Sequence, residues 1–147
     1  MGRNLNILKQ YGLQFYTYEA LPAEAKPAIE EYRSEYDTPA TIRRRRYGLA
    51  QVPLSVVADI HLRDANRGQA ACGFDLFADF AAYHRECTQQ GDTPSYPSGS
   101  PRWPCIISSL EDEFFEDGHH RFHAYVNAGD THIPCLYVGG VQKRHEV

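Results

Sequence analysis

Residues 114–125 limit the possible folds of this chain more than any other segment. The segment begins with two phenylalanines, passes an acidic turn at Asp117 and Gly118, and continues as a helix-forming sequence. Aspartate is a good helix N-cap, and glycine accepts the backbone conformations of a sharp turn. We therefore predict a strand that runs directly into a helix at Gly118, with Asp117 as the N-cap residue.

This predicted turn also has the chemistry of an anion site. The first N–H groups of a helix have no partner within the helix and carry a partial positive charge, which favours a bound anion. Arg121 lies in the first helical turn, and a guanidinium group matches the geometry of a phosphate. Phosphate is therefore the first ligand that the sequence indicates.

Patterns along the rest of the chain predict an α+β fold. The expected strands are 13–18, 52–57, 105–110, 113–116 and 133–138, and the expected helices are 21–36, 73–90 and 118–128. The helix over 73–90 has an aromatic face that includes His84, and we expect this face to pack in the core. Residues 61–68 are polar and residues 91–104 are rich in proline, so both are predicted as loops.

Composition narrows the class of protein. A chain of 147 residues with 42% hydrophobic content suits a single domain. The formal net charge of -4 argues against general, charge-driven binding to nucleic acid or anionic lipid. No apolar run reaches the roughly 20 residues of a membrane helix, so we expect a cytoplasmic protein without a membrane partner. The four cysteines form no CxxC pair, which is typical of buried, reduced thiols.

Three short motifs resemble the ParB/sulfiredoxin-like superfamily. They are the Val52-Pro53-Leu54 strand opening, the Asp117-Gly118-His119-His120-Arg121 turn, and the Ile133-Pro134 strand that follows Ala128-Gly129. The resemblance implies a ParB/sulfiredoxin-like mixed sheet with packed helices over residues 51–140. A strand-helix extension over residues 1–50 precedes this core, and a tail over residues 141–147 follows it. We expect all three parts to form one domain.

In this superfamily the Gly-x-x-Arg turn binds nucleotide phosphates. The resemblance therefore implies that ATP or another NTP is bound by Gly118, His119, His120 and Arg121. Sulfiredoxins have a reactive cysteine where this chain has His119, so reduction of a sulfinic acid is not expected. ParB partition proteins continue into a helix-turn-helix domain, which this sequence does not show. The members that remain are phosphate-transferring kinases and plasmid proteins described as ParB-like nucleases or NTPases.

Hydrolysis or transfer of a phosphate also needs a carboxylate that holds Mg²⁺ or activates the attacking oxygen. Asp64 is the first candidate, because related kinases place an acidic catalytic residue after the opening strand. Its neighbours Arg63 and Arg67 make a structural salt bridge an equal alternative. Both roles of Asp64 therefore stay open.

The turn itself offers two further candidates for catalysis. Asp117 has either a purely structural N-cap role or a role as acid, base or metal ligand. His119 is the candidate general acid. A histidine at this position would serve equally well as a hydrogen-bond donor to a phosphate oxygen. His119 and His123 lie four residues apart, but no cysteine or carboxylate framework accompanies them, so we predict no metal site.

Two other functions are compatible with the sequence. Adjacent guanidinium groups at Arg43, Arg44, Arg45 and Arg46 would suit a ParB-like nuclease or a DNA-binding accessory protein. Such a run is more often a solvated face or a partner of acidic surface, and here the acidic segment 24–35 is the obvious partner. The second alternative is a non-catalytic interaction module of a plasmid or phage.

Overall fold

The computed structural model describes residues 2–89, 103–109 and 113–141, and it leaves the side chains of His119 and His120 undescribed. Within these residues the fold is α+β, as the sequence predicts. The helices are α1 (Arg3–Gln10), α2 (Ala25–Arg33), α3 (Pro39–Arg44), α4 (Leu54–Ala71), α5 (Phe80–Gln89) and α6 (His119–Ala128). The strands are β1 (Gln14–Tyr16), β2 (Arg45–Pro53), β3 (Cys105–Ile107), β4 (Phe115–Asp117) and β5 (His132–Val141).

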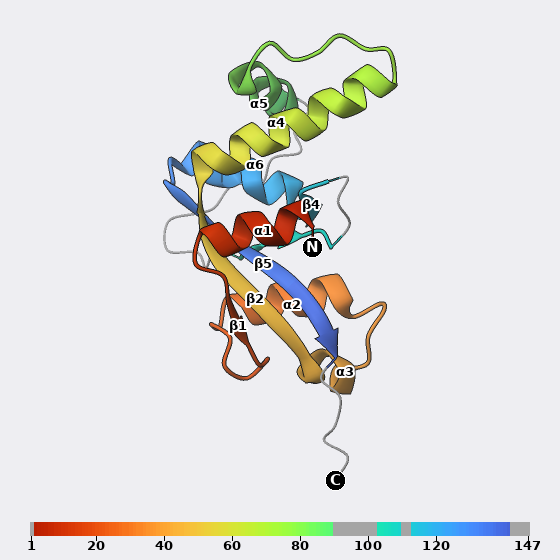
Figure 1. Ribbon diagram of the computed structural model, residues 1–147, viewed down its shortest axis with the longest axis vertical. Coiled ribbons are helices and arrows are strands. Elements are labelled where there is room, and N and C mark those ends of the chain that lie inside the picture. The colour runs from red at the N-terminus through yellow and green to blue at the C-terminus, as the bar shows by residue number, and fades with distance from the viewer. Residues whose placement is uncertain (1, 90–102, 110–112, 142–147) are drawn as a thin grey trace.

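The five strands form one mixed sheet in the order β1-β2-β5-β3-β4 (Figure 1). Strands β2 and β5 make its long antiparallel centre, and β1 and β4 lie at the two edges. Strand β3 runs parallel to β5, with Cys105 opposite Cys135 as their first pair. Because β2 and β1 are part of this sheet, the first 53 residues and the last strands share one core.

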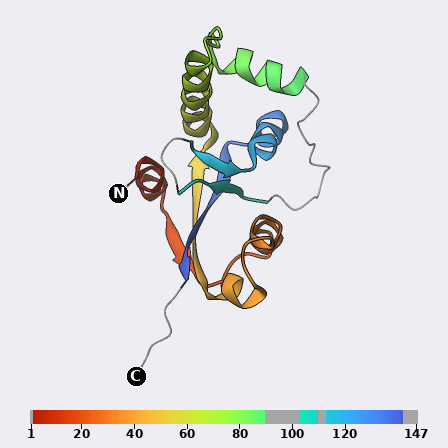
Figure 2. The same cartoon turned by 90° about the vertical axis from the view of Figure 1, so that its right-hand side faces the viewer.

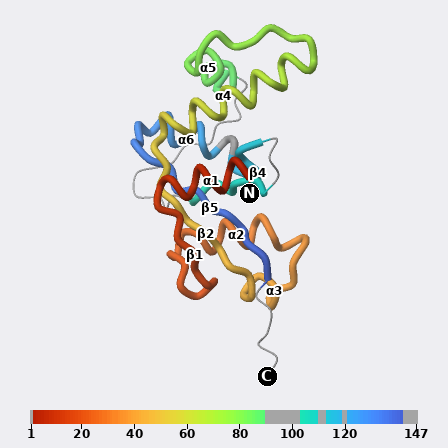
Figure 3. The backbone as a smooth tube through the Cα atoms, in the orientation of Figure 1, coloured from red at the N-terminus to blue at the C-terminus, as the bar shows by residue number. Residues whose placement is uncertain are grey.

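Helices cover both sides of the sheet. Figure 2 shows α1 on one side and α2 with α6 on the other, while α4 and α5 lie beyond the end of the sheet. One group of buried side chains surrounds Phe115 and Phe122, and a second surrounds Tyr47 and Ile29. The α4–α5 hairpin extends away from the sheet (Figure 3).

Two predictions are wrong for the residues that form helix α4. Residues 54–57 were predicted as strand and 61–68 as loop, but both belong to α4. The buried side chains of this helix are Val57, Ala58, Ile60 and His61, which follow helical spacing. The polar residues that suggested a loop are the solvated face of the same helix.

The aromatic helix is shorter than predicted. Helix α5 begins at Phe80 and has no buried residue among those described, and Phe74 is 63% exposed in the connection before it. The predicted core face is therefore wrong for Phe74. The predicted packing is confirmed in part for Phe80 and His84, whose rings pack against α6 while they stay partly exposed. The N-terminal helix α1 was not predicted at all, because its first residues are polar.

The cysteines divide into two classes. All four thiols are free, but only Cys105 and Cys135 are buried, whereas Cys72 is exposed and Cys87 is intermediate. Burial raises the pKa of Cys105 to about 12 and the pKa of Cys135 well above its ordinary value. The prediction of buried thiols is thus confirmed for the two residues that pair across β3 and β5.

In the described part of the chain, no helix combines the length and apolar character needed to cross a membrane.

Candidate functional site

The predicted phosphate turn joins β4 to α6, as the sequence indicates. Strand β4 ends at Asp117, and Gly118 adopts φ +103° before the first residue of α6. The helix N-cap is Gly118 and makes no side-chain capping bond, so the prediction of Asp117 as N-cap is wrong. Asp117 remains in the sheet opposite Ile106, and the change of direction takes place one residue later.

Gly118 has a structural reason for its identity that is independent of any ligand. It is buried, and a Cβ atom at this position would lie 3.2 Å from the Cα of Cys105 and 3.3 Å from its Sγ. Its backbone conformation is also one that side chains with a Cβ rarely adopt. The turn is therefore fixed against β3.

Replacing Gly118 by alanine should lower the free energy of unfolding by about 2–3 kcal/mol, from backbone strain and from the contact with Cys105. Gly129, the C-cap of α6, is the matched control, because it has φ +76° but its Cβ would meet nothing within 4 Å. Gly129→Ala should cost only about 1–2 kcal/mol. Urea unfolding of the two variants measures the difference, and equal losses would show that Cys105 does not restrict the turn.

Arg121 and Tyr125 hold the segment that enters β3. The Arg121 Nη1 donates to the Pro104 carbonyl at 2.9 Å, and its guanidinium lies 5.4 Å from the centre of the Trp103 ring. The Tyr125 hydroxyl donates to the Trp103 carbonyl at 2.6 Å. Pairing of β3 with β5 begins only at Cys105, so these two side chains, one turn apart on α6, bind carbonyls just ahead of the strand. The Trp103 ring therefore packs against Arg121 of α6.

The two histidines that follow Gly118 belong to the first turn of α6, but their side chains lie outside the described residues, so the candidate roles of His119 and His120 stay predictions. His123, by contrast, is buried and lies against α5. Its Nδ1 is 2.7 Å from the Nδ1 of His84, whose Nε2 is 2.8 Å from the Asn127 Oδ1. If the Asn127 oxygen accepts, a neutral His84 carries its proton on Nε2 and accepts the Nδ1 proton of His123.

A third imidazole lies in the same region. His61 of α4 is 4% exposed, and its Nε2 is 3.0 Å from the Tyr83 hydroxyl. Its ring contacts those of Phe122 and His123. Helices α4, α5 and α6 thus meet through a cluster of histidine and aromatic rings, in which His61 and His123 are buried. The contribution of α4 to this cluster was not predicted, although the helical spacing of His61 with Val57 could have indicated burial.

The carboxylate of Asp64 accepts hydrogen bonds from three other residues. This residue lies within α4, and its carboxylate accepts two hydrogen bonds from Arg3, at 2.9 and 3.1 Å, and one from Arg67 at 2.9 Å. The backbone N–H of Phe114 donates to it at 2.9 Å. The side chain is 9% exposed. Of the two roles left open by the sequence, this geometry favours the salt bridge.

The arginine run is divided between two elements. Arg43 and Arg44 end α3, while Arg45 and Arg46 begin β2. Arg45 bonds the carboxylate of Asp37 and the carbonyl of Gly139. Arg46 lies over the ring of Phe15 at 5.6 Å. Arg45 is thus held by the fold, whereas Arg43, Arg44 and Arg46 are exposed, so the DNA-binding role of the run stays a prediction.

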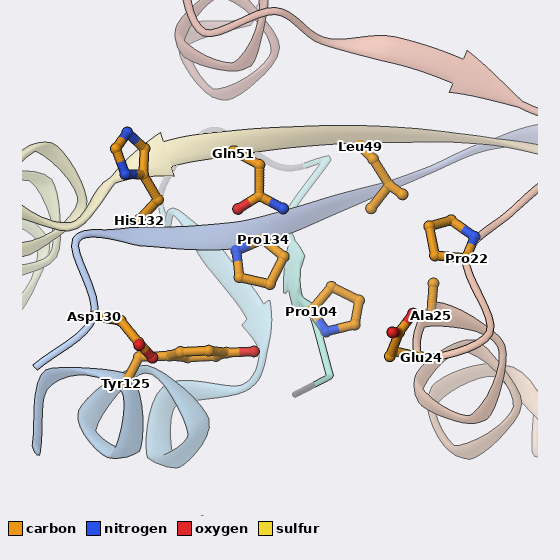
Figure 4. A pocket seen from close by; sticks show the side chains of 10 residues that line it. All are labelled: Pro22, Glu24, Ala25, Leu49, Gln51, Pro104, Tyr125, Asp130, His132 and Pro134. Carbon is orange, nitrogen blue, oxygen red and sulfur yellow. The ribbon is translucent and has the colours of Figure 1, made fainter. Parts of the chain in front are cut away.

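A cavity of about 370 Å³ lies on the α2 and α6 side of the sheet, and we call it the sheet-face pocket (Figure 4). Its lining residues are Pro22, Glu24, Ala25, Leu49, Gln51, Pro104, Tyr125, Asp130, His132 and Pro134. The pocket is lined by Pro104, which lies in the segment held by α6, and by Tyr125 of α6 itself. Such a volume falls within the range of small-molecule sites.

Among the residues that the structure describes, no group of three or more histidine, cysteine or acidic side chains is arranged to hold a metal ion. Comparison of the chain with protein-family models, with curated proteins and with solved structures finds no match.

Proposed function

We propose that this chain is a nucleotide-binding protein that holds the phosphates of ATP or another NTP at the start of α6. The observation that carries the proposal is the turn in which β4 ends at Asp117, Gly118 redirects the backbone, and a ten-residue helix begins with Arg121 in its first turn. The positive end of the helix and a guanidinium group would act on the same anion. The proposed ligands are Gly118, His119, His120 and Arg121.

The order of elements supports a ParB/sulfiredoxin-like core. Strand β2 ends with Val52 and Pro53, α4 follows it, and β3, β4, α6 and β5 complete the series. The Gly-x-x-Arg turn opens α6, and Ile133-Pro134 lies in β5, the central strand of the sheet. This arrangement agrees with the motif order on which the resemblance rests.

The contact between Arg121 and the Pro104 carbonyl is compatible with phosphate binding. A guanidinium group has five N–H donors, and this hydrogen bond uses one of them. Arg121 is partly exposed, so its other donors can approach a phosphate while the contact with Pro104 holds the group in place. The same contact means that Arg121 also contributes to stability.

We further propose that any turnover, either NTP hydrolysis or phosphoryl transfer, uses Mg²⁺ bound with the nucleotide and a carboxylate beside the turn. Asp117 is the better candidate for this carboxylate, because it is adjacent to Gly118 and partly exposed. Asp64 is held by two arginines and a backbone amide.

Titration with ATP and CTP, with and without Mg²⁺, tests the proposal. We expect Arg121→Ala to weaken nucleotide binding by at least about tenfold, the effect of losing one charge-assisted contact. The variant should also unfold more easily, by about 1–3 kcal/mol, so binding must be measured where circular dichroism shows it folded. Arg63→Ala, an exposed arginine on α4, is the control and should bind normally.

Unchanged nucleotide affinity in folded Arg121→Ala would refute the site. Salt-dependent binding of DNA that is lost on replacing Arg43 and Arg44, and kept in Arg121→Ala, would instead support the DNA-binding alternative. Release of phosphate from the γ position would separate turnover from binding alone.

A further inference from the structure

The connection between α4 and α5 presents two large apolar side chains to solvent. Phe74 is 63% exposed and Leu76 is 59% exposed, and Asp75 between them is exposed as well. We call residues 74–76 the exposed tip. It belongs to the hairpin that extends away from the sheet (Figure 3). Neighbouring apolar side chains that a fold leaves in water often mark a contact surface.

Hydrogen bonds to α4 hold the backbone of the tip in place. The N–H of Phe74 donates to the Gln69 carbonyl at 2.9 Å, and the Gln69 Nε2 donates to the Asp75 carbonyl at 2.9 Å. Just after the tip, the Asn66 side chain accepts from the N–H of Phe77 at 2.8 Å and donates to its carbonyl at 3.2 Å. The apolar side chains therefore stand on a fixed backbone, which lowers the entropy lost when a partner binds.

A second exposed apolar surface lies at the start of β2 and the end of β5. It is an open groove of about 440 Å³, lined by Phe15, Arg46, Tyr137, Gly139, Gly140 and Val141, and we call it the strand-end groove. Phe15 and Val141 are each 39% exposed. Arg46 is exposed, and its guanidinium lies 5.6 Å from the centre of the Phe15 ring. The groove thus combines an apolar surface with a positive charge.

The tip and the groove have complementary chemistry but lie far apart in one molecule. The tip places an acidic Asp75 between apolar side chains, and the groove places a basic Arg46 beside apolar side chains. Strand β2 begins beside the groove and leads into α4, whose far end precedes the tip, so both elements separate the two surfaces (Figure 1). A folded chain therefore cannot bring its own tip to its own groove, whereas a second copy can.

We propose that the exposed tip of one copy docks in the strand-end groove of another copy of this chain. The apolar side chains of the tip cover those of the groove, and Asp75 pairs with Arg46, which fixes the orientation. The contact joins different surfaces of the two copies. It therefore either closes when two antiparallel copies engage each other's grooves or continues from copy to copy. Because both surfaces are small, the association is weak and depends on concentration.

Sedimentation equilibrium of the full chain at rising concentration measures this association. We expect the weight-average mass to rise above that of one chain as the concentration increases. Asp75→Arg and Arg46→Asp should each weaken the association by at least about fivefold, because each replaces an attraction with a repulsion. Leu76→Ser should weaken it by a similar factor, because less apolar area is buried in the contact.

A mixture of the two charge variants tests the pairing itself. In the mixture, one tip–groove contact has both charges reversed, and the other contact keeps Asp75 with Arg46. The mixture should therefore associate at least about fivefold more tightly than either variant alone. Asp59→Arg and Tyr36→Ser are the matched controls, because they change an exposed charge and an exposed ring outside both surfaces. Both controls should associate as the parent chain does.

The two surfaces share no residue with the start of α6. Nucleotide binding should therefore be the same in these variants as in the parent chain, so failure of this inference is distinct from failure of the proposed function. A parent chain that keeps the mass of one chain at every concentration would overturn the inference and leave another protein as the partner of the tip. Association that persists equally in Asp75→Arg, Arg46→Asp and Leu76→Ser would also overturn it, as would a mixture that associates no better than its components.

Discussion

Asp64→Ala should lower the free energy of unfolding by about 3–4 kcal/mol, because it removes a carboxylate that is 9% exposed and pairs with two arginines, and it leaves a backbone donor without its acceptor. The carboxylate joins Arg3 of α1 and Arg67 of α4 to the N–H of Phe114, which precedes β4. One side chain therefore connects the N-terminal helix, the long helix and the edge of the sheet. Urea unfolding monitored by circular dichroism measures the loss.

Asp59→Ala is the matched control for this substitution. Asp59 lies on the same helix and pairs with Arg63, but its side chain is 68% exposed, so its loss should cost less than about 1 kcal/mol. Asp64→Asn should fall between the two, since its amide oxygen can still accept from Phe114. If Asp64→Ala unfolds at the same urea concentration as Asp59→Ala but has lost nucleotide turnover, Asp64 is catalytic and the structural assignment is wrong.

The segment around α6 could be predicted because its signals are local. A glycine between a strand and a helix, and a second glycine where the helix ends, fix the bounds of α6 within a few residues. Gly118 and Gly129 both have positive φ in the structure. The strands β3, β4 and β5 follow from short apolar runs on either side, so the core of the candidate phosphate site was accessible from sequence.

The role of Asp64 could not be predicted in the same way. Its partner Arg3 lies 61 residues earlier in the chain, and nothing near Asp64 in the sequence distinguishes an anchor from a catalytic acid. The polar residues around it suggested a loop, although they form one face of α4. A solvated helix face and a loop have similar composition, and only the spacing of Val57, Ile60 and His61 separates them.

Tertiary contacts also decide what the polar residues of α6 do. His123 was considered beside His119 as part of one helical face, but it is directed at His84 of α5. Arg121 was expected at the anion, and in the structure it binds the carbonyl that precedes β3. Each of these contacts joins α6 to an element more than ten residues away, which the sequence alone does not place.

Asp37→Asn should produce a loss of similar size, about 3–4 kcal/mol at neutral pH, and this loss should depend on pH. Asp37 follows α2, is 5% exposed, and accepts paired hydrogen bonds from both Arg33 and Arg45. Hydrogen bonds from Arg33 and then from Arg45 lower the pKa of the Asp37 carboxyl far below its ordinary value. Arg45 also donates a hydrogen bond to the Gly139 carbonyl, so this network joins the connection between α2 and α3 to strands β2 and β5.

The sign of the pH effect follows from that lowered pKa. The folded chain keeps Asp37 ionised at pH values where the unfolded chain, with an ordinary carboxyl pKa of about 3.9, takes up a proton. The contribution of Asp37 to stability is therefore complete above about pH 5 and decreases as the pH falls through and below 4. Urea unfolding of the parent chain and of Asp37→Asn should show a gap that narrows progressively below pH 4, whereas Asp59→Asn should differ little from the parent at any pH. A gap that stays constant from pH 7 to pH 3 would mean that the asparagine disturbs packing rather than charge, and that Arg45 is not held by an ionised partner.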